Sequence, residues 1–240
     1  MHLFYQHDIS LGFLSEEESL HAAKVLRLQN GDAIVVLDGL GGFHEAVLTE
    51  SHPKRAKFSI TKSIQHYGQK NYRLHIAIAP TKSIDRLEWF IEKAVEIGID
   101  EISLLQCRFS ERKHVNIQRL EKIIIAACKQ SIQAYFPILN PLIPFEQFIA
   151  NTNDQYAGIS KYIAHCYDSE KHPLKSAIQQ SNELLILIGP EGDFSQEEID
   201  LAQRHNFLPI SLGNSRLRTE TAGVMACATV AIVRDTIAEL

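Results

Sequence analysis

Two glycine-containing loops in the last quarter of the chain have residue types suited to binding a small molecule. The first, 189–194 (GPEGDF), follows the apolar run Leu184 to Ile188, and the second, 212–222 (LGNSRLRTETA), follows Leu208 to Ser211. Each pattern is typical of a strand that ends in a loop and then leads into a helix. In open α/β sheets, ligands bind just beyond the carboxyl ends of the strands. We therefore expect both loops to contribute polar and charged walls to one site.

The first loop has the composition of a rigid turn that a ligand can approach closely. Gly189 and Gly192 allow positive φ and a close approach of the backbone, and Pro190 stiffens the turn. Glu191 offers a carboxylate to hydroxyl or amine groups of a ligand. The loop matches neither GxGxxG nor GxxxxGK[ST], which argues against dinucleotide and P-loop chemistry. A tight connection between a strand and a helix is the structural alternative.

The second loop places a cation where a helix is expected to begin. Arg218 precedes that helix, and a positive charge at a helix N-terminus is unfavourable. Its presence there suggests an anionic partner, either an RNA phosphate or a charge that develops during a reaction. A salt bridge from Arg218 to Glu220 is the structural alternative. Ala222 and Gly223 are small enough for a ligand or another backbone to pack against the helix start.

The elements that must position these loops fall into two parts. Residues 1–70 contain several short β patterns and one helix, which predicts a small barrel, and the polar stretch 66–71 is the expected domain boundary. From residue 71 to 240, strands alternate with helices, which predicts an α/β domain with a mostly parallel sheet covered on both faces. The expected strands are 33–37, 43–50, 57–64, 74–79, 102–106, 136–139, 162–166, 184–188 and 208–212. The expected helices begin at the capping residues Ser15, Asn116, Ser195 and Thr219, and one further helix ends at Gly98.

Composition narrows the class of protein. The net charge is −5, so nothing drives the whole chain toward nucleic acid, although residues 51–73 hold six basic and no acidic residues. No apolar run approaches the roughly 20 residues that cross a bilayer, and the N-terminus lacks a signal-peptide pattern. The four cysteines form no CxxC pair and the histidines have no metal-site spacing. We expect a cytoplasmic protein with reduced thiols and no metal.

The two loops, GPEGDFSQEEI and LGNSRLRTETA, resemble the signature segments of the RsmE family of ribosomal RNA methyltransferases, within the SPOUT superfamily. TKSIDRLEWFIEKAVEIG is similar to that family's first methyltransferase helix, and HAAKVLRLQNGDAIVVLDG is similar to its PUA-related N-terminal domain. The resemblance implies a PUA-like, RNA-binding β-barrel over 1–70. It also implies a SPOUT-type α/β domain with a trefoil knot over 71–240.

The resemblance also implies a function. That function is methylation of ring nitrogen 3 of a uridine in 16S ribosomal RNA of the small subunit, with S-adenosylmethionine as cofactor, by a homodimer. Alternatives are a different RNA target or a non-catalytic RNA-binding homologue. Arg218 and Glu220 are the implied catalytic residues. The implied cofactor-binding residues are Leu187, Ile188, Gly189, Pro190, Glu191, Gly192, Leu212, Gly213, Asn214, Ser215, Leu217, Thr219, Thr221 and Ala222. The implied RNA-binding residues are Lys24, Arg27, Lys54, Arg55, Lys57, Lys82, Arg86, Arg108 and Arg112.

Three departures from the family pattern concern the expected RNA contacts. The family's arginine near the N-terminus is absent, since the chain begins Met1-His2-Leu3-Phe4-Tyr5. A Glu-Gln-Ser-x-Arg pattern is replaced by 129–133 (KQSIQ), and an Arg-Ser pair appears within 108–112 (RFSER).

Other reactive or aromatic side chains have structural interpretations. Trp89 and Phe90 are expected to pack within their helix, and Cys227 is expected to fill the core. His165, beside a strand end, is expected in the core or at its rim.

Overall fold

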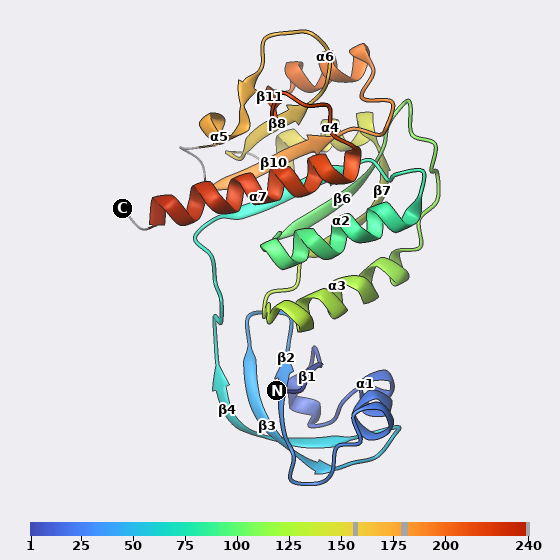
Figure 1. Cartoon of the computed structure of the whole chain (residues 1–240), viewed down its shortest axis with the longest axis vertical. Helices are drawn as coiled ribbons and strands as arrows, with labels where there is room; N and C mark the ends of the chain where they lie inside the picture. Colours follow the sequence, from blue (N-terminus) through green and yellow to red (C-terminus); the bar gives the residue numbers. More distant parts are fainter. Residues whose placement is uncertain (156–157, 179–181, 239–240) are drawn as a thin grey trace. The chain divides into compact units, whose positions relative to one another are not determined.

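The computed structural model describes residues 1–155, 158–178 and 182–238, and the chain divides into two compact units. Unit 1 contains Met1–Gln69 and Ile125–Phe136, and unit 2 contains Lys70–Ile124 and Pro137–Leu240. Figure 1 shows the two sets of elements. The sequence pattern does not anticipate that 125–136, which includes the end of a long helix, belongs to the first unit.

Unit 1 is built on a four-stranded sheet with the order β1-β2-β3-β4. β1 runs parallel to β2, and β2, β3 and β4 are antiparallel neighbours. Phe4, Val36, Leu48 and Phe58 lie in the core between the sheet and a short helix. The three predicted strands are confirmed, whereas β1 was too short to be recognised. The elements are β1 (Leu3–Tyr5), a 3₁₀ turn (Ile9–Leu11), α1 (Glu16–Leu20), a π-helical turn (His21–Val25), β2 (Ala33–Leu37), β3 (Phe43–Glu50) and β4 (Lys57–Ile64).

Helix α1 begins as predicted but uses its glutamate differently. The Ser15 side chain accepts a hydrogen bond from the Glu18 backbone N–H (3.3 Å). The Glu18 carboxylate accepts from the Tyr5 backbone N–H (3.4 Å) and from Lys129 Nζ (2.6 Å), so the capping box is not reciprocal. Lys129, the charge that departs from the family pattern, is therefore neutralised within unit 1.

Unit 2 is an α/β fold with a seven-stranded sheet of order β7-β6-β5-β10-β8-β11-β9, in which every neighbouring pair is parallel. The predicted fold class is confirmed. Helices α4 and α5 and strand β9 were not predicted. The elements are β5 (Arg73–Ile78), α2 (Ile84–Ile97), β6 (Glu101–Gln106), α3 (Ile117–Ser131), β7 (Ile138–Pro144), α4 (Phe145–Gln155), β8 (Ser160–Ala164), β9 (His172–Pro173), α5 (Leu174–Ala177), β10 (Glu183–Ile188), α6 (Gln196–Arg204), β11 (Leu208–Ser211) and α7 (Thr219–Ala238).

Helices cover both faces of this sheet. On one face, Phe145 of α4 and Ile199 of α6 pack in one buried cluster with Leu187 of β10. On the other face, α7 packs on α2, β5 and β10 (Figure 1). A Cβ at Gly223 would lie 2.5 Å from the Phe90 ring, so only glycine permits this close approach of α7 to α2.

Several helix ends follow the predicted chemistry. Gly98 ends α2 in the left-handed conformation (φ 103), and Asn116 Oδ1 accepts from the Arg119 backbone N–H (3.1 Å) at the start of α3. Ser195 and Glu198 form a reciprocal capping box at the start of α6. Phe90 is buried as expected. The packing role expected for Trp89 is wrong, because 44% of its surface is exposed on the outer side of α2.

The strand order brings the carboxyl ends of β10, β8 and β11 together. From β11, which is near one edge of the sheet, the chain returns along α7 to the middle of the sheet and to α2. This is the course expected of the C-terminal segment in a trefoil knot. Both glycine loops follow strands in this group, so the fold places them together at the carboxyl ends of the strands.

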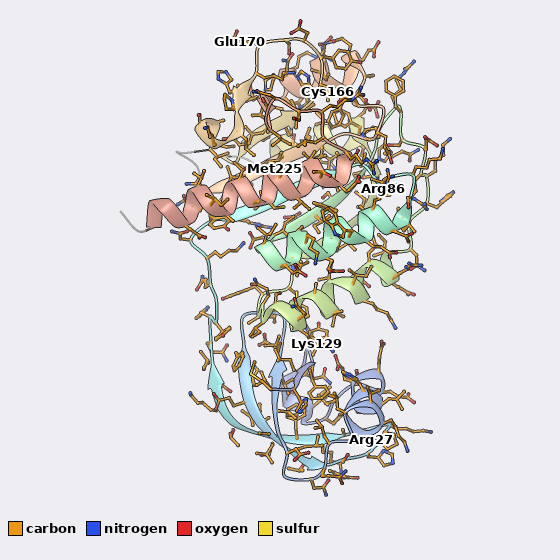
Figure 2. All side chains as sticks on the ribbon, viewed as in Figure 1. Arg27, Arg86, Lys129, Cys166, Glu170 and Met225 are labelled. Atoms are coloured by element: carbon orange, nitrogen blue, oxygen red, sulfur yellow. The ribbon has the colours of Figure 1, made fainter. Side chains whose placement is uncertain are left out.

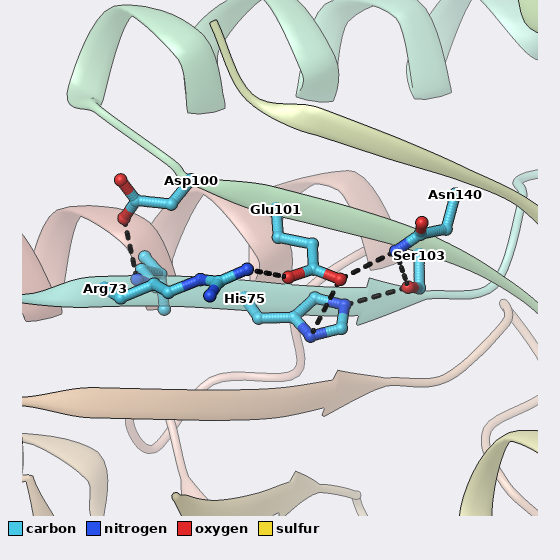
Figure 3. A network of polar contacts seen from close by, with 7 residues as sticks. Arg73, His75, Asp100, Glu101, Ser103 and Asn140 are labelled. Atoms are coloured by element: carbon cyan, nitrogen blue, oxygen red, sulfur yellow. Dashed lines mark hydrogen bonds and ion pairs between the residues drawn. The ribbon is translucent and has the colours of Figure 1, made fainter. Parts of the chain in front are cut away.

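The opposite ends of the strands, where β5, β6 and β7 begin, hold a polar network around the buried Glu101 and His75 (Figure 3). Glu101, 5% exposed, accepts hydrogen bonds from Arg73 Nη2 (2.6 Å) and Asn140 Nδ2 (2.8 Å). His75 Nε2 lies 2.8 Å from Ser103 Oγ. Burial lowers the pKa of His75 from its usual 6.5 to about 4; the nearby Glu101 carboxylate opposes this shift and Arg73 adds to it. The imidazole is therefore neutral near pH 7.

Candidate functional site

Two adjoining cavities, of about 310 and 390 Å³, lie at the carboxyl ends of β10, β8 and β11. They share the lining residues Ala164, Cys166, Arg216, Leu217 and Ala222. The smaller cavity is also lined by Ile188, Gly189, Pro190, Glu191, Asp193, Arg218 and Thr219, and the larger by His165, Lys171, Ile210, Ser211, Leu212, Gly213, Asn214 and Ser215.

These cavities bring together most of the residues that the two loops were expected to contribute. Three of the expected cofactor residues do not line them. Leu187 is fully buried in the core, and Thr221 lies half-buried on the first turn of α7. Gly192 is exposed and faces Phe109, since a Cβ there would lie 3.0 Å from the Phe109 Cβ.

The first loop is held rigid by Asp193, not by its glycines. Asp193 has positive φ (66°), whereas neither Gly189 nor Gly192 does, so the conformational role expected for those glycines is wrong. The Asp193 carboxylate accepts from the backbone N–H groups of Cys166 (2.7 Å) and Phe194 (2.8 Å). Gly189 is needed for space, because a Cβ would lie 3.1 Å from the Phe194 ring.

The loop after β5 braces the first loop from the side. Glu191 Oε1 accepts from the Lys82 backbone N–H (2.9 Å). Arg112 donates to the carbonyl oxygens of Thr81 (3.0 Å) and Lys82 (2.6 Å), and the Lys82 ammonium pairs with Glu111 (2.8 Å). Arg112, which was expected to bind RNA, therefore holds the loops together. Lys82, also expected to bind RNA, is paired with Glu111.

The carboxyl end of β8 forms a third wall that sequence reasoning missed. Cys166, labelled in Figure 2, lines both cavities and is exposed. Partial burial of its thiol and the neighbouring Asp193 raise its pKa. His165, 8% exposed, lines the larger cavity, and burial is the main cause that lowers its pKa. The sequence predicted a strand ending at these residues, but it did not reveal that this strand lies between β10 and β11.

Arg218 and Glu220 lie close in sequence but have different surroundings. Arg218 is exposed in the wall of the smaller cavity, and it forms no ion pair with any residue that the structure describes. Its carbonyl accepts from the Ala222 backbone N–H (2.8 Å), so it occupies the cap position of α7. Glu220 is only 7% exposed, and its carboxylate faces Arg86 Nε at 3.8 Å. The structural alternative of an Arg218–Glu220 pair is therefore wrong. Arg216, which lies in the second loop but was not among the expected site residues, is exposed in the wall of both cavities.

The remaining expected RNA-binding cations are distributed over each unit. In unit 1, Lys24, Arg27 and Lys54 are exposed, and Arg55 lies over the Phe13 ring (4.0 Å). Lys57 pairs with Glu50 at 2.6 Å. In unit 2, Arg108 is exposed and Arg86 is half-buried against Glu220.

Other features of the described residues bear on function only by exclusion. Within 1–155, 158–178 and 182–238, no group of three or more His, Cys, Asp or Glu side chains is arranged to hold a metal ion. No helix in that part of the chain is long and apolar enough to cross a membrane. A third cavity of about 550 Å³ lies beside the polar network at the amino ends of the strands, but Arg73, Glu101 and Asn140 in its wall already bind one another.

Comparisons with known proteins agree with both units. The model of the RNA methyltransferase domain family matches residues 68–231, and that of the RNA methyltransferase PUA domain matches residues 14–61. Ribosomal RNA small subunit methyltransferase E of Rickettsia conorii is 30% identical over 92% of this chain and 89% of its own length. The same-named protein of Buchnera aphidicola is 28% identical over 93% of this chain and 90% of its own.

Solved structures give the same result. A probable rRNA-methyltransferase from Porphyromonas gingivalis is 38% identical, covers 99% of this chain and 100% of its own, and superposes with a TM-score of 0.89. Ribosomal RNA small subunit methyltransferase E from Neisseria gonorrhoeae, solved bound to S-adenosylmethionine, is 26% identical with a TM-score of 0.84, over 97% of this chain and 98% of its own. The chain therefore belongs to the RsmE family of S-adenosylmethionine-dependent ribosomal RNA methyltransferases.

Proposed function

We propose that this protein methylates ring nitrogen 3 of a uridine in 16S ribosomal RNA of the small subunit. The names of its relatives support the RNA, and the resemblance of the two loops supports the position on the base. The observation that carries the proposal is the exposed Arg218, which pairs with no described residue and lies in the wall of a cavity formed by both loops.

The residues present fit S-adenosylmethionine, which supplies a methyl group on a positively charged sulfur. Apolar groups such as Ile188, Leu217 and Ala222 line the cavities, and the carboxylates of Glu191 and Asp193 lie in the wall of the smaller one. Either carboxylate can face the positive sulfur or the amino group of this ligand, and Arg216 and Arg218 in the same wall can face anionic groups. The backbone around Asp193 is fixed by hydrogen bonds, so the polar groups of this wall are in place before a ligand arrives.

The reaction needs a change of protonation at the base. Nitrogen 3 of uracil carries a proton and attacks a methyl group only once that proton has left, when negative charge spreads to the carbonyl oxygens. The Arg218 guanidinium stabilises that charge. The N–CH₃ bond then forms as the S–CH₃ bond breaks, and the sulfur leaves as neutral S-adenosylhomocysteine. The proton passes to solvent or to a nearby acceptor.

Glu220 is poorly placed as that acceptor. Its carboxylate is buried and faces Arg86, and it lines neither cavity. We assign it to holding Arg86 and the first turn of α7, where a carboxylate is stabilised by the helix dipole.

The same proposal includes a homodimer in the cytoplasm. Helix α7 is apolar on more than its buried side, with Met225 41% and Ile232 66% exposed, and the neighbouring α2 exposes Trp89. Figure 2 labels Met225 on α7. An exposed apolar stripe of this kind fits the same stripe of a second copy. A cytoplasmic location follows from the proposed ribosomal substrate.

Mass spectrometry of nucleosides from small-subunit ribosomal RNA tests the function directly. We expect 3-methyluridine to be absent from a strain lacking the gene and to return when the wild-type gene is restored. Its persistence in the deletion strain would refute the assignment. Calorimetry with S-adenosylmethionine separates the enzyme from a non-catalytic RNA-binding homologue, which would not bind the cofactor.

A further inference from the structure

An exposed aromatic ring, that of Phe109, lies against the first glycine-containing loop (189–194). Phe109 is 46% exposed. Burying a phenylalanine side chain is favourable in free energy, so its exposure to water is a cost. Its side chain contacts Gly192, where a Cβ would lie 3.0 Å from the Phe109 Cβ and 3.6 Å from its Cγ. Because Gly192 has no side chain, Phe109 lies close against the loop whose neighbouring residues line the smaller cavity.

The turn that carries Phe109 is held on both sides. The Ser110 backbone N–H donates to the Cys107 carbonyl (3.1 Å), and Ser110 Oγ accepts from the Cys107 backbone N–H (3.0 Å). The Arg108 backbone N–H donates to Glu198 Oε1 (2.8 Å), which ties the turn to the start of α6. Beyond the turn, Arg112 is bonded to the loop after β5. The ring is thus presented by a rigid backbone, not by a free loop.

The charges around the ring suit a polyanion. Arg108, next to Phe109 in the turn, is exposed, and Arg216 and Arg218 are exposed in the wall of the cavity that the Gly192 loop lines. Proteins that bind single-stranded nucleic acid combine cations for the phosphates with aromatic side chains on which bases stack. The segment 108–112 is also one of the places where this chain departs from the family pattern, by a phenylalanine between the arginine and the serine.

We propose that Phe109 stacks on an unpaired nucleobase of the RNA substrate and so helps to hold the RNA at the cofactor cavity. This inference rests on the proposed function, because it requires an RNA substrate. Stacking is tolerant of base identity, so Phe109 contributes to affinity for the RNA and leaves cofactor binding unchanged.

Steady-state methylation of small ribosomal subunits isolated from the deletion strain tests this role. We expect Phe109→Ala to raise KM for the subunits about tenfold, with cofactor affinity by calorimetry unchanged. Phe109→Leu keeps apolar contact with Gly192 but has no aromatic face, so its KM should rise as much. Phe109→Tyr should retain the wild-type KM. Ile138→Ala, at an exposed apolar position where β7 begins, is the matched control and should change nothing.

Fluorescence gives a second readout. The chain has one tryptophan, so Trp89→Phe combined with Phe109→Trp places the only indole at the proposed stacking position. A short uridine-rich single-stranded RNA should quench its emission, while free S-adenosylmethionine should not.

The proposal is overturned if Phe109→Ala or Phe109→Leu has the wild-type KM, or if the RNA leaves the indole emission unchanged. Equal loss of cofactor affinity would show that the ring only supports the Gly192 loop, and a changed oligomeric state would show that it packs against a second copy. If the wild-type protein does not methylate the subunits at all, the proposed function fails instead, which distinguishes the two failures.

Discussion

The parallel sheet of unit 2 carries charged side chains both where its strands begin (the amino edge) and where they end (the carboxyl edge). The charged groups are paired with one another at the amino edge and open to a cavity at the carboxyl edge. At the amino edge, Arg73 and Asn140 bind Glu101, and each group has its partner within the protein. At the carboxyl edge, Arg218 lines a cavity and forms no ion pair with a described residue. Among the same described residues, Glu191 accepts through one oxygen, from the loop beside it.

This difference separates stability from function within one sheet. Buried polar groups cost free energy unless they bind one another, so the amino edge is internally paired. Groups that are held by a rigid backbone yet not paired are available to a ligand. In open α/β sheets, ligands bind at the carboxyl ends of the strands, and the loops that follow the strands there carry such groups.

The largest expected effect is at the carboxyl edge. Replacing Arg218 by Ala should lower the methylation rate by about 10²- to 10³-fold, because the charge that develops on the uracil loses its cation. Cofactor affinity should stay within about twofold, as for loss of an interaction formed only in the transition state. Radiolabelled methyl transfer and calorimetry measure the two quantities. Arg204→Ala, at the exposed end of α6, is the control. Parallel loss of rate and cofactor affinity would mean that Arg218 builds the pocket.

At the amino edge the same kind of change should act on stability alone. Glu101→Gln removes the charge that Arg73 and Asn140 bind, and it should lower the free energy of unfolding by about 2–3 kcal/mol. Cofactor affinity, measured by calorimetry on the folded protein, should not change. Urea denaturation gives the stability. A variant with wild-type stability but weakened cofactor binding would reverse the roles of the two edges.

His75 makes the amino edge sensitive to acid. Its pKa in the folded protein, about 4, lies below its usual 6.5, so the unfolded chain binds a proton more readily between these values. The stability from neutral His75 is fully present above about pH 6.5 and is lost as the pH falls toward 4. This loss should amount to about 2 kcal/mol between pH 7 and pH 5.

Urea midpoints at the two pH values, compared with those of His75→Gln, test this expectation. The variant has no group that titrates there, so its midpoint should vary less with pH. If both proteins lose the same stability, the acid sensitivity arises elsewhere.

The sequence predicted the carboxyl edge better than the amino edge, for a physical reason. The two glycine-containing loops carry glycine, proline and charged residues in patterns that local chemistry explains, and Gly98 and Ser195 end and begin helices as expected. Strand order is set by long-range packing, so no local pattern revealed that β8 lies between β10 and β11 and adds Cys166 to the site.

Tertiary contacts also explain why helix α4 was not predicted. Helix α4 has the sequence FEQFIANTNDQ, whose asparagines and threonine are poor helix formers, and burial of Phe145, Phe148 and Ile149 stabilises it. Likewise, the partner of Glu220 is Arg86, which is distant in sequence on α2, and not the nearby Arg218. Side-chain pairing across elements is the part that the sequence alone could not supply.

The smallest expected effect separates charge from shape at the carboxyl edge. Glu191→Gln keeps an oxygen that accepts from the Lys82 backbone N–H but removes the negative charge. If that charge acts on the positive sulfur, the Kd for S-adenosylmethionine should rise about fivefold, which is about 1 kcal/mol. The Kd for uncharged-sulfur S-adenosylhomocysteine should change less. Calorimetry with both ligands gives the comparison, and Glu183→Gln at the amino end of β10 is the control. An equal change for both ligands would place Glu191 at a part of the cofactor that the two ligands share, its amino-acid group or its ribose, because they differ only at sulfur.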